Sequence, residues 1–304
     1  MAWLSHKAWE LPGPDTLLLN IGMTLDFRNC NLLWTSVLVE TLVRLGLRLA
    51  VVSPGSRSAP LAIACAAHPK VEAIPILDER SAAFFALGYA KRRQQPVVLI
   101  CSSGTAGANM YPAIIEAQQS AVPLLVLTAD RPPELHDCHA GQAIQQTHLF
   151  GVHANYYAEL SLPTASLSAL AYLRQTIANA WERTLLPRSG PVHLNCPFRD
   201  PLAPLPEPAI ADLANQLDAE SFFAHLQPWV EQPRLALQPG TITQAIAAMR
   251  SVERGLIIVG PAQPVAAVAF VQTVMAIADS LGWPVLTDAL NPLRSHADAD
   301  SSNN

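Results

Sequence analysis

Four short polar segments contain most of the residues in this 304-residue chain that could do chemistry. They are residues 53–58 (SPGSRS), 78–80 (DER), 102–105 (SSGT) and 128–132 (TADRP), and each follows a short apolar run. If those runs are parallel strands, the segments meet at the carboxyl ends of the strands, where α/β proteins bind ligands. An arginine, a carboxylate and backbone amides at helix starts would then lie together, as needed to hold an anion and to protonate a cofactor.

Taken singly, these residues also have ordinary structural interpretations. Arg57 could be a surface guanidinium, and Ser56 or Ser58 could cap a helix. Glu79 could be a charge at a helix start, where the helix dipole favours it. Each segment alone therefore leaves a structural and a functional interpretation open.

Two further patterns are weak signals of binding sites. Residues 103–107 (SGTAG) follow a strand pattern and hint at phosphate binding, but they lack the lysine of a P-loop and the three-glycine spacing of a dinucleotide-binding loop. His136, Cys138 and His139 could suggest a metal ion, yet no further pair of ligands stands nearby in the sequence. We therefore predict no metal site within this chain.

Apolar periodicity predicts the elements that position these segments. Helical spacing and short continuous apolar runs alternate along the first 200 residues. The predicted helices cover residues 31–45, 60–67, 81–92, 106–118 and 167–185, and the predicted strands cover residues 47–52, 73–77, 97–101, 124–128 and 192–196. This alternation predicts an α/β fold with a parallel sheet that is buried on both faces.

Changes in composition predict the domain organisation. Residues 1–22 show no clear period, and we interpret them as a leader or a mispredicted start before Met23. We expect a first domain over residues 23–200, a proline-rich linker over 201–241, and an incomplete α/β domain over 242–304 with helices at 242–250 and 265–281 and strands at 256–259 and 285–288. The chain is expected to be truncated, because it stops where a third strand should follow.

Charge and cysteine content narrow the classes of function. Only 14% of the residues are charged and the net charge is −5, which offers no basic surface for nucleic acid or for an anionic membrane. No apolar run approaches the roughly 20 residues that cross a bilayer. The five cysteines never form a CxxC pair, which favours reduced thiols in a cytoplasmic protein. A small-molecule ligand is the expectation that remains.

The order of the motifs is more specific than any one of them. SPGSRS (53–58), ILDERSAAFFALGYAK (76–91), SSGTAGANMYPAIIEA (102–117), LTADRPPEL (127–135) and AGQAIQQ (140–146) occur in succession. Together they resemble the N-terminal pyrimidine-binding domain of one thiamine-diphosphate enzyme family, the 2-succinyl-5-enolpyruvyl-6-hydroxy-3-cyclohexene-1-carboxylate (SEPHCHC) synthases, over residues 23–197. Enzymes of the acetolactate synthase type share the fold and a glutamate, but not SPGSRS or TADRPPEL.

The resemblance implies a transferase activity. It implies decarboxylating addition of 2-oxoglutarate to isochorismate, in menaquinone or phylloquinone biosynthesis, with thiamine diphosphate and Mg²⁺ as cofactors. Glu79 would support the reactive tautomer of the cofactor by hydrogen bonding to its pyrimidine ring. Substrate contacts are implied for Ser56, Arg57, Gln142 and Arg131, although Arg131 could equally brace its loop. Further cofactor contacts are implied for Pro54, Gly55, Ser103, Gly104, Thr105 and Asn109.

The resemblance also implies parts that these 304 residues lack. In the family, a C-terminal domain with a Gly-Asp-Gly motif holds Mg²⁺ and the diphosphate, and that motif does not occur here. Gly141 stands where some members have an asparagine, and it cannot supply that amide. The site would be completed in a dimer or tetramer, or by a complementary C-terminal half. A fragmentary gene, a split enzyme, and a non-catalytic remnant or assembly module are the open alternatives.

Overall fold

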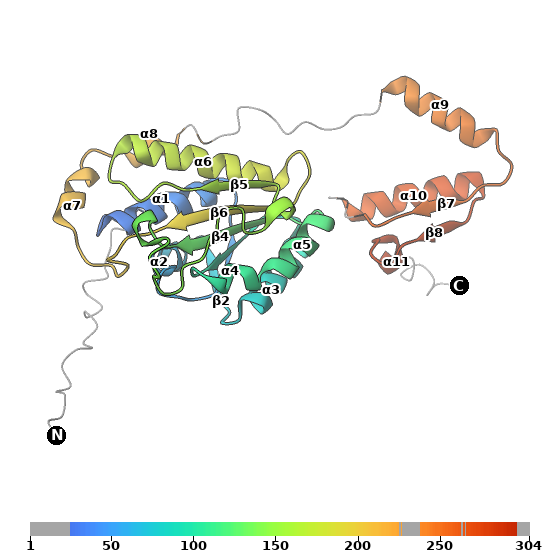
Figure 1. Cartoon of the computed structure of the whole chain (residues 1–304). Helices are drawn as coiled ribbons and strands as arrows, with labels where there is room; N and C mark the ends of the chain where they lie inside the picture. The colour runs from blue at the N-terminus through green and yellow to red at the C-terminus, as the bar shows by residue number, and fades with distance from the viewer. Residues whose placement is uncertain (1–24, 225, 227–237, 263, 265, 297–304) are drawn as a thin grey trace. The chain divides into compact units, whose positions relative to one another are not determined.

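The computed structural model describes residues 25–224, 226, 238–262, 264 and 266–296 (Figure 1). The chain divides into two compact units, residues 1–230 and 231–304, and each is described by itself. The expected leader, residues 1–22, lies outside the described residues. None of the described helices is long and apolar enough to cross a membrane.

A six-stranded sheet in the order β2-β1-β3-β4-β6-β5 forms the centre of the first unit. Every pair of neighbouring strands is parallel, so the predicted fold class is confirmed. The strands are β1 (Leu49–Val52), β2 (Glu72–Pro75), β3 (Val97–Cys101), β4 (Leu124–Asp130), β5 (Tyr156–Glu159) and β6 (Pro191–Pro197). Strand β5 was not predicted, because its sequence YYAE contains no continuous apolar run.

Helices cover both faces of this sheet (Figure 1). One face packs against α1 (Cys30–Arg44), α2 (Ala59–Ala67) and α6 (Leu167–Leu185), and the other against α3 (Glu79–Arg93), α4 (Thr105–Asn109) and α5 (Tyr111–Gln119). The single helix predicted over residues 106–118 is wrong. It is two helices that meet at Met110, and Pro112 at the start of α5 cannot donate the amide hydrogen bond that a continuous helix requires.

The segment expected to be a linker, residues 201–241, continues the first unit over residues 201–224, and its last residues begin α9 of the second unit. It contains α7 (Pro208–Ala214) and α8 (Ala219–Phe223). Four apolar side chains of this segment are buried against the core of the first unit: Ile210, Leu213, Leu217 and Phe223. Pro208 lies in the first turn of α7, where a missing amide hydrogen costs nothing. Pro208 therefore marks a helix start rather than an extended connection.

The second unit is smaller and less covered. Helix α9 (Pro239–Arg250), β7 (Ile257–Val259), α10 (Ala267–Leu281), β8 (Val285–Thr287) and α11 (Leu293–His296) follow in that order. Strands β7 and β8 pair in parallel. Their central residues, Ile258 and Leu286, are 75% and 57% exposed, so this sheet is not enclosed as the first one is.

Candidate functional site

The carboxyl ends of the parallel strands of the first unit form a rim of loops. The first three polar segments singled out from the sequence follow β1, β2 and β3, and the fourth, residues 128–132, begins inside β4 and continues past its end. Two of these loops are in direct contact, because a Cβ atom added at Gly55 would lie 2.5 Å from Ser102 Cβ. Only glycine permits this approach, which holds the loop after β1 against the loop after β3.

Glu79 is the first residue of α3 and lies at this rim. Its neighbour Asp78 caps the helix by accepting a hydrogen bond from the Ser81 amide at 2.7 Å. Glu79 is half-buried, and no hydrogen bond or ion pair engages its carboxylate within the described residues. Burial, and then the negative charge of Glu79, raise the pKa of the Cys101 thiol at the end of β3. The carboxylate therefore lies close to β3 and retains its capacity to accept a hydrogen bond.

Arg57 is buried rather than a surface guanidinium. Its Nη1 donates to the carbonyl of Phe198 at 2.9 Å and lies 3.5 Å from Asp200 Oδ2. These bonds connect the loop after β1 to the end of β6, across the intervening strands β3 and β4. The Arg57 Nε atom is buried and has no partner among the described residues.

Arg131 braces the rim, as one of its two interpretations proposed. Its Nη1 donates to Ser103 Oγ at 2.6 Å and its Nη2 donates to the Gly141 carbonyl at 2.7 Å. Burial, and then the positive charge of Arg57, lower the pKa of Arg131. Two guanidinium groups therefore repel each other at the rim, and an anion bound beside them would relieve that repulsion.

The remaining predicted contact residues differ in how free they are. Gln142 adopts a φ of +58°, and its Nε2 donates to the Ser103 carbonyl at 3.0 Å. The Asn109 amide donates to the Thr105 carbonyl within α4 at 3.2 Å. Pro54, Ser56, Thr105 and Asn109 are all exposed. Gln142, Ser103 and Gly104 therefore bond to other loops, whereas Pro54, Ser56, Thr105 and Asn109 lie at the exposed edge of the rim.

The structure adds two residues that the sequence reasoning missed, Gln146 and Asn195. Both are 1% exposed. Gln146 Oε1 accepts a hydrogen bond from the Gly104 amide at 2.7 Å, so this amide is already engaged within the chain. For Asn195, the sequence offered one signal: an asparagine within a strand predicted to be buried must have hydrogen-bond partners. Gln146 beside the exposed Gln145 gave no such signal.

No metal centre emerges from the described part of the chain. Within those residues, no group of three histidine, cysteine or acidic side chains could hold a metal ion. His136 instead lies with its Nε2 3.1 Å from the Arg131 carbonyl and 3.8 Å from Asp130 Oδ2. The residues present therefore do not fit Mg²⁺.

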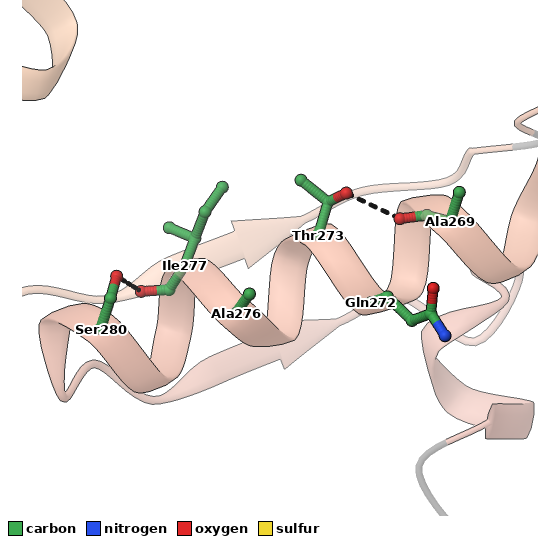
Figure 2. A pocket seen from close by; sticks show the side chains of 6 residues that line it. All are labelled: Ala269, Gln272, Thr273, Ala276, Ile277 and Ser280. Atoms are coloured by element: carbon green, nitrogen blue, oxygen red, sulfur yellow. Dashed lines mark hydrogen bonds between the residues drawn. The ribbon is translucent and has the colours of Figure 1, made fainter.

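A shallow hollow of about 470 Å³ lies on the second unit, along α10 (Figure 2). Its lining consists of Ala269, Gln272, Thr273, Ala276, Ile277 and Ser280. The hydroxyl groups of Thr273 and Ser280 donate to carbonyls of their own helix. A surface formed by one helix, without a charged group, offers no catalytic chemistry, so the rim of the first unit is the candidate site.

Comparison with known proteins finds a matching family and several relatives. The family described as thiamine pyrophosphate enzyme, N-terminal TPP binding domain, matches residues 34–150. A SEPHCHC synthase of Acaryochloris marina is 54% identical over 92% of this chain and 47% of its own length. The chain is homologous to the SEPHCHC synthases. A second SEPHCHC synthase, from Synechococcus elongatus, is 58% identical over 91% of this chain and 46% of its own length.

The homology to SEPHCHC synthases confirms the predicted resemblance, and the chain spans about half the length of these curated relatives. Among solved structures, a thiamine diphosphate-dependent 4-hydroxybenzoylformate decarboxylase of Rhodococcus jostii RHA1 superposes with a TM-score of 0.63. It covers 84% of this chain and 44% of its own length at 19% identity. At that identity, the likeness establishes a shared fold and no more.

Proposed function

We propose that this chain supplies the pyrimidine side of a SEPHCHC synthase site. The reaction is the thiamine-diphosphate-dependent addition of 2-oxoglutarate to isochorismate, with loss of carbon dioxide, in menaquinone or phylloquinone biosynthesis. The observation that carries the proposal is the free, half-buried carboxylate of Glu79 at the same rim as the two guanidinium groups of Arg57 and Arg131. Thiamine diphosphate, when bound, supplies a carbon nucleophile for 2-oxo acids.

Glu79 has the chemistry that the cofactor's pyrimidine ring requires. A carboxylate facing a ring nitrogen stabilises the protonated nitrogen by a charge-assisted hydrogen bond. Within the described residues, nothing competes for the Glu79 oxygens. Pro54, Gly55, Ser103, Gly104, Thr105 and Asn109 are proposed to contribute further cofactor contacts. Because the Gly104 amide already donates to Gln146, Gly104 can offer the cofactor only its carbonyl and the space left by its missing side chain.

Arg57 and Arg131 suit the carboxylates of the two substrates. Their mutual repulsion favours an anion at the rim, and the unpaired Nε of Arg57 is a donor without a partner in the described structure. Gln142 and Ser56 lie in the loops that carry or contact these arginines, and we assign them substrate contacts as well. Mg²⁺ and the diphosphate are assigned to a separate C-terminal domain, because the described residues do not fit a metal.

A second chain beside Glu79 is part of the proposal. Leu77 is 83% exposed, and Phe84 and Phe85 on α3 are 44% and 42% exposed. Apolar side chains next to a catalytic carboxylate favour an interface with another subunit, in a dimer or tetramer, or with a complementary half. Cys65, Cys101 and Cys196 are buried free thiols, which suits the reducing cytoplasm.

A non-catalytic assembly module is the second candidate. It is favoured by the number of rim groups that already bond to one another, since the two Nη atoms of Arg131, the Gln142 amide and the Gly104 amide have partners within the chain. A module of this kind would keep the fold and the interface but would turn over no substrate.

Carbon dioxide release from 2-oxoglutarate, dependent on isochorismate, separates the two candidates. The purified chain is assayed with Mg²⁺ and thiamine diphosphate, alone and mixed with the C-terminal half of a homologous synthase. We expect release in the mixture and none when Glu79→Gln replaces the wild-type chain. Complex formation without release would contradict the synthase proposal and support the assembly module.

A further inference from the structure

A connected set of buried polar side chains lies beneath the rim. Its members are Thr128, Asp130, Gln146, His193 and Asn195, and each is at most 1% exposed. They come from β4, from β6 and from the loop before Phe150. Buried polar groups cost free energy unless they find partners, so their hydrogen bonds require an account.

The hydrogen-bond directions at one end of this network are determined by the number of donors. Thr128 Oγ1 donates its one hydrogen to Asn195 Oδ1 at 2.9 Å. His193 Nε2 lies 2.8 Å from the same Thr128 oxygen and must therefore be the donor of that pair. Burial, and then the positive charge of His148, lower the pKa of His193 to about 3, which keeps the ring neutral. The network thus selects the Nε2-protonated tautomer.

Asn195 and Gln146 extend the network to the rim. Asn195 Oδ1 accepts a second hydrogen bond from Gln146 Nε2 at 2.8 Å, and Asn195 Nδ2 donates to Asp130 Oδ2 at 2.7 Å. Gln146 Nε2 also donates to the Ala129 carbonyl at 3.2 Å. Its Oε1 is left to accept from the Gly104 amide. A reversed Gln146 amide would face the Gly104 nitrogen with its own nitrogen, so the partners allow only this orientation.

Both ends of the network meet residues of the candidate site. Gly104 has a φ of +77°, and a Cβ atom there would lie 2.9 Å from Gln142 Cγ. The adjacent Ser103 hydroxyl accepts from Arg131 Nη1 and donates to the Gln142 carbonyl. At the other end, Asp130 Oδ1 accepts from the Arg131 amide at 2.7 Å. A shift of the network would therefore move both the Gly104 turn and Arg131.

We propose that Gln146 and Asn195 are positioning residues, which hold the Gly104 turn in the conformation that places Ser103, Gln142 and Arg131 around the site. The positioning follows from the hydrogen bonds of the chain itself. Its importance for substrate use rests on the proposed function. Hydrogen exchange of the Gly104 amide therefore tests the positioning, and KM tests its importance for substrate use.

Gln146→Glu tests the hydrogen-bond directions. A carboxyl group has the shape of the amide, but it can donate to Asn195 Oδ1 only when it is protonated. The Asn195 oxygen and the Ala129 carbonyl are both acceptors, so the folded protein should hold the pKa of this carboxyl above the value of about 4.3 in an unfolded chain. The bond to Asn195 is then present at low pH and is lost as the pH rises through the raised pKa.

The readout is hydrogen exchange of the Gly104 amide by NMR, as a protection factor relative to wild type at each pH. We expect near-wild-type protection at pH 5 and a loss of about tenfold at pH 8, because the ionised carboxylate is repelled by the Asn195 oxygen and the Ala129 carbonyl and moves away from the Gly104 amide. The charges of the groups that interact with the network help to set this midpoint; they are His136, Tyr157, Glu159, Cys196 and Arg131 around Asp130, and His148 beside His193. Gln145→Glu places the same charge at an exposed neighbouring position and should change nothing.

Gln146→Met removes the hydrogen bonds at every pH and should lower Gly104 protection without recovery at pH 5. Unchanged Gly104 protection in a folded Gln146→Met chain, or a Gln146→Glu chain that follows wild type at both pH values, would overturn the network. If these variants do not fold, ¹⁵N shifts of His193 in the wild-type chain decide, and an Nδ1-protonated ring would overturn it. In the active mixture, loss of Gly104 protection with unchanged KM for both substrates would overturn the positioning role.

Discussion

The two units of this chain share the same strand-helix-strand pattern but differ in how fully their strands are covered. In the first unit, every residue of β3 and β4 is buried between two layers of helices. In the second unit, Ile258 and Leu286 at the strand centres remain largely exposed. The same local pattern therefore does not ensure the same environment, because enclosure depends on how many layers are present.

Enclosure also decides where polar chemistry is found. The buried strands of the first unit hold Thr128, His193 and Asn195 in a network that a dry environment strengthens. The described strands of the second unit, with the sequences IIV and VLT, hold only Thr287, whose hydroxyl lies 3.4 Å from the next carbonyl. Among the described residues, the buried polar network therefore lies in the unit whose sheet is covered on both faces.

Among the tests of the difference between the two units, Glu79→Gln should have the largest effect on turnover. In the mixture that restores activity, we expect turnover to fall by roughly 10²- to 10⁴-fold, because the amide cannot accept the proton-sharing hydrogen bond as a carboxylate does. The measurement is carbon dioxide release at saturating substrates. Asp279→Asn, the same kind of change on α10 of the second unit, serves as the control and should leave turnover unchanged. Near-normal turnover of Glu79→Gln would remove this residue from its assigned role.

Core substitutions should separate the stabilities of the two sheets. Leu194→Ala, at a fully buried position of β6, should lower the free energy of unfolding of the first unit by about 2–5 kcal/mol. Ile258→Ala, at a largely exposed position of β7, should change the second unit by less than about 1 kcal/mol. Urea unfolding followed by probes in each unit measures both. A large loss in Ile258→Ala would mean that β7 is covered in solution and would break the comparison.

Arg57→Ala should mainly weaken substrate use. We expect kcat/KM to fall by roughly 10- to 100-fold, since a hydrogen bond to a charged group contributes about 1.5–3 kcal/mol. Steady-state kinetics with each substrate varied gives the value, and Arg48→Ala at an exposed position is the control. Because Arg57 also bonds to Phe198, a thermal melt of the variant accompanies the kinetics. Unchanged saturation by both substrates would make Arg57 purely structural.

Acid titration should show the smallest effect within any one pH unit, and it tests the buried His193 of the first unit. The folded pKa of His193, about 3, lies below the ordinary value of about 6.5. Below pH 6.5 the unfolded chain therefore binds a proton that the folded chain does not, and the free energy of unfolding falls by up to about 1.4 kcal/mol per pH unit until pH 3. His193→Gln lacks this titration and should flatten the dependence. Parallel curves for the two proteins would contradict a buried neutral ring.

The regular elements and the rim could be predicted because they depend on local patterns. Strand β3 and helix α6 match their predicted bounds, since each combines a clear period with a distinct end. The meeting of the four loops followed from the rule for parallel sheets. Strand β5 has no continuous apolar run, and the helices α7 and α8, with 7 and 5 residues, are too short for a helical period to be recognised.

The internal contacts of the site could not be predicted, because they join residues far apart in the sequence. The Arg57 guanidinium bonds to the carbonyl of Phe198, 141 residues away, and this contact excludes the alternative interpretation of Arg57 as a surface charge. The Gly104 amide meets Gln146 across 42 residues, and Thr128 meets Asn195 across 67. No local pattern encodes such pairs. The roles of Glu79 and the other site residues remain predictions.

The packing of α7 and α8 has a consequence for cutting the protein into pieces. A fragment that ends at Asp200 would expose the apolar surface that Ile210, Leu213 and Phe223 cover, and would be prone to aggregation. It would also lose the carbonyls of Ala203 and Leu205, to which the Asn29 amide donates at 3.0 and 3.1 Å. The shortest soluble fragment of the first unit should therefore extend past Phe223. Truncated clones of this protein should place their stop codons after that residue.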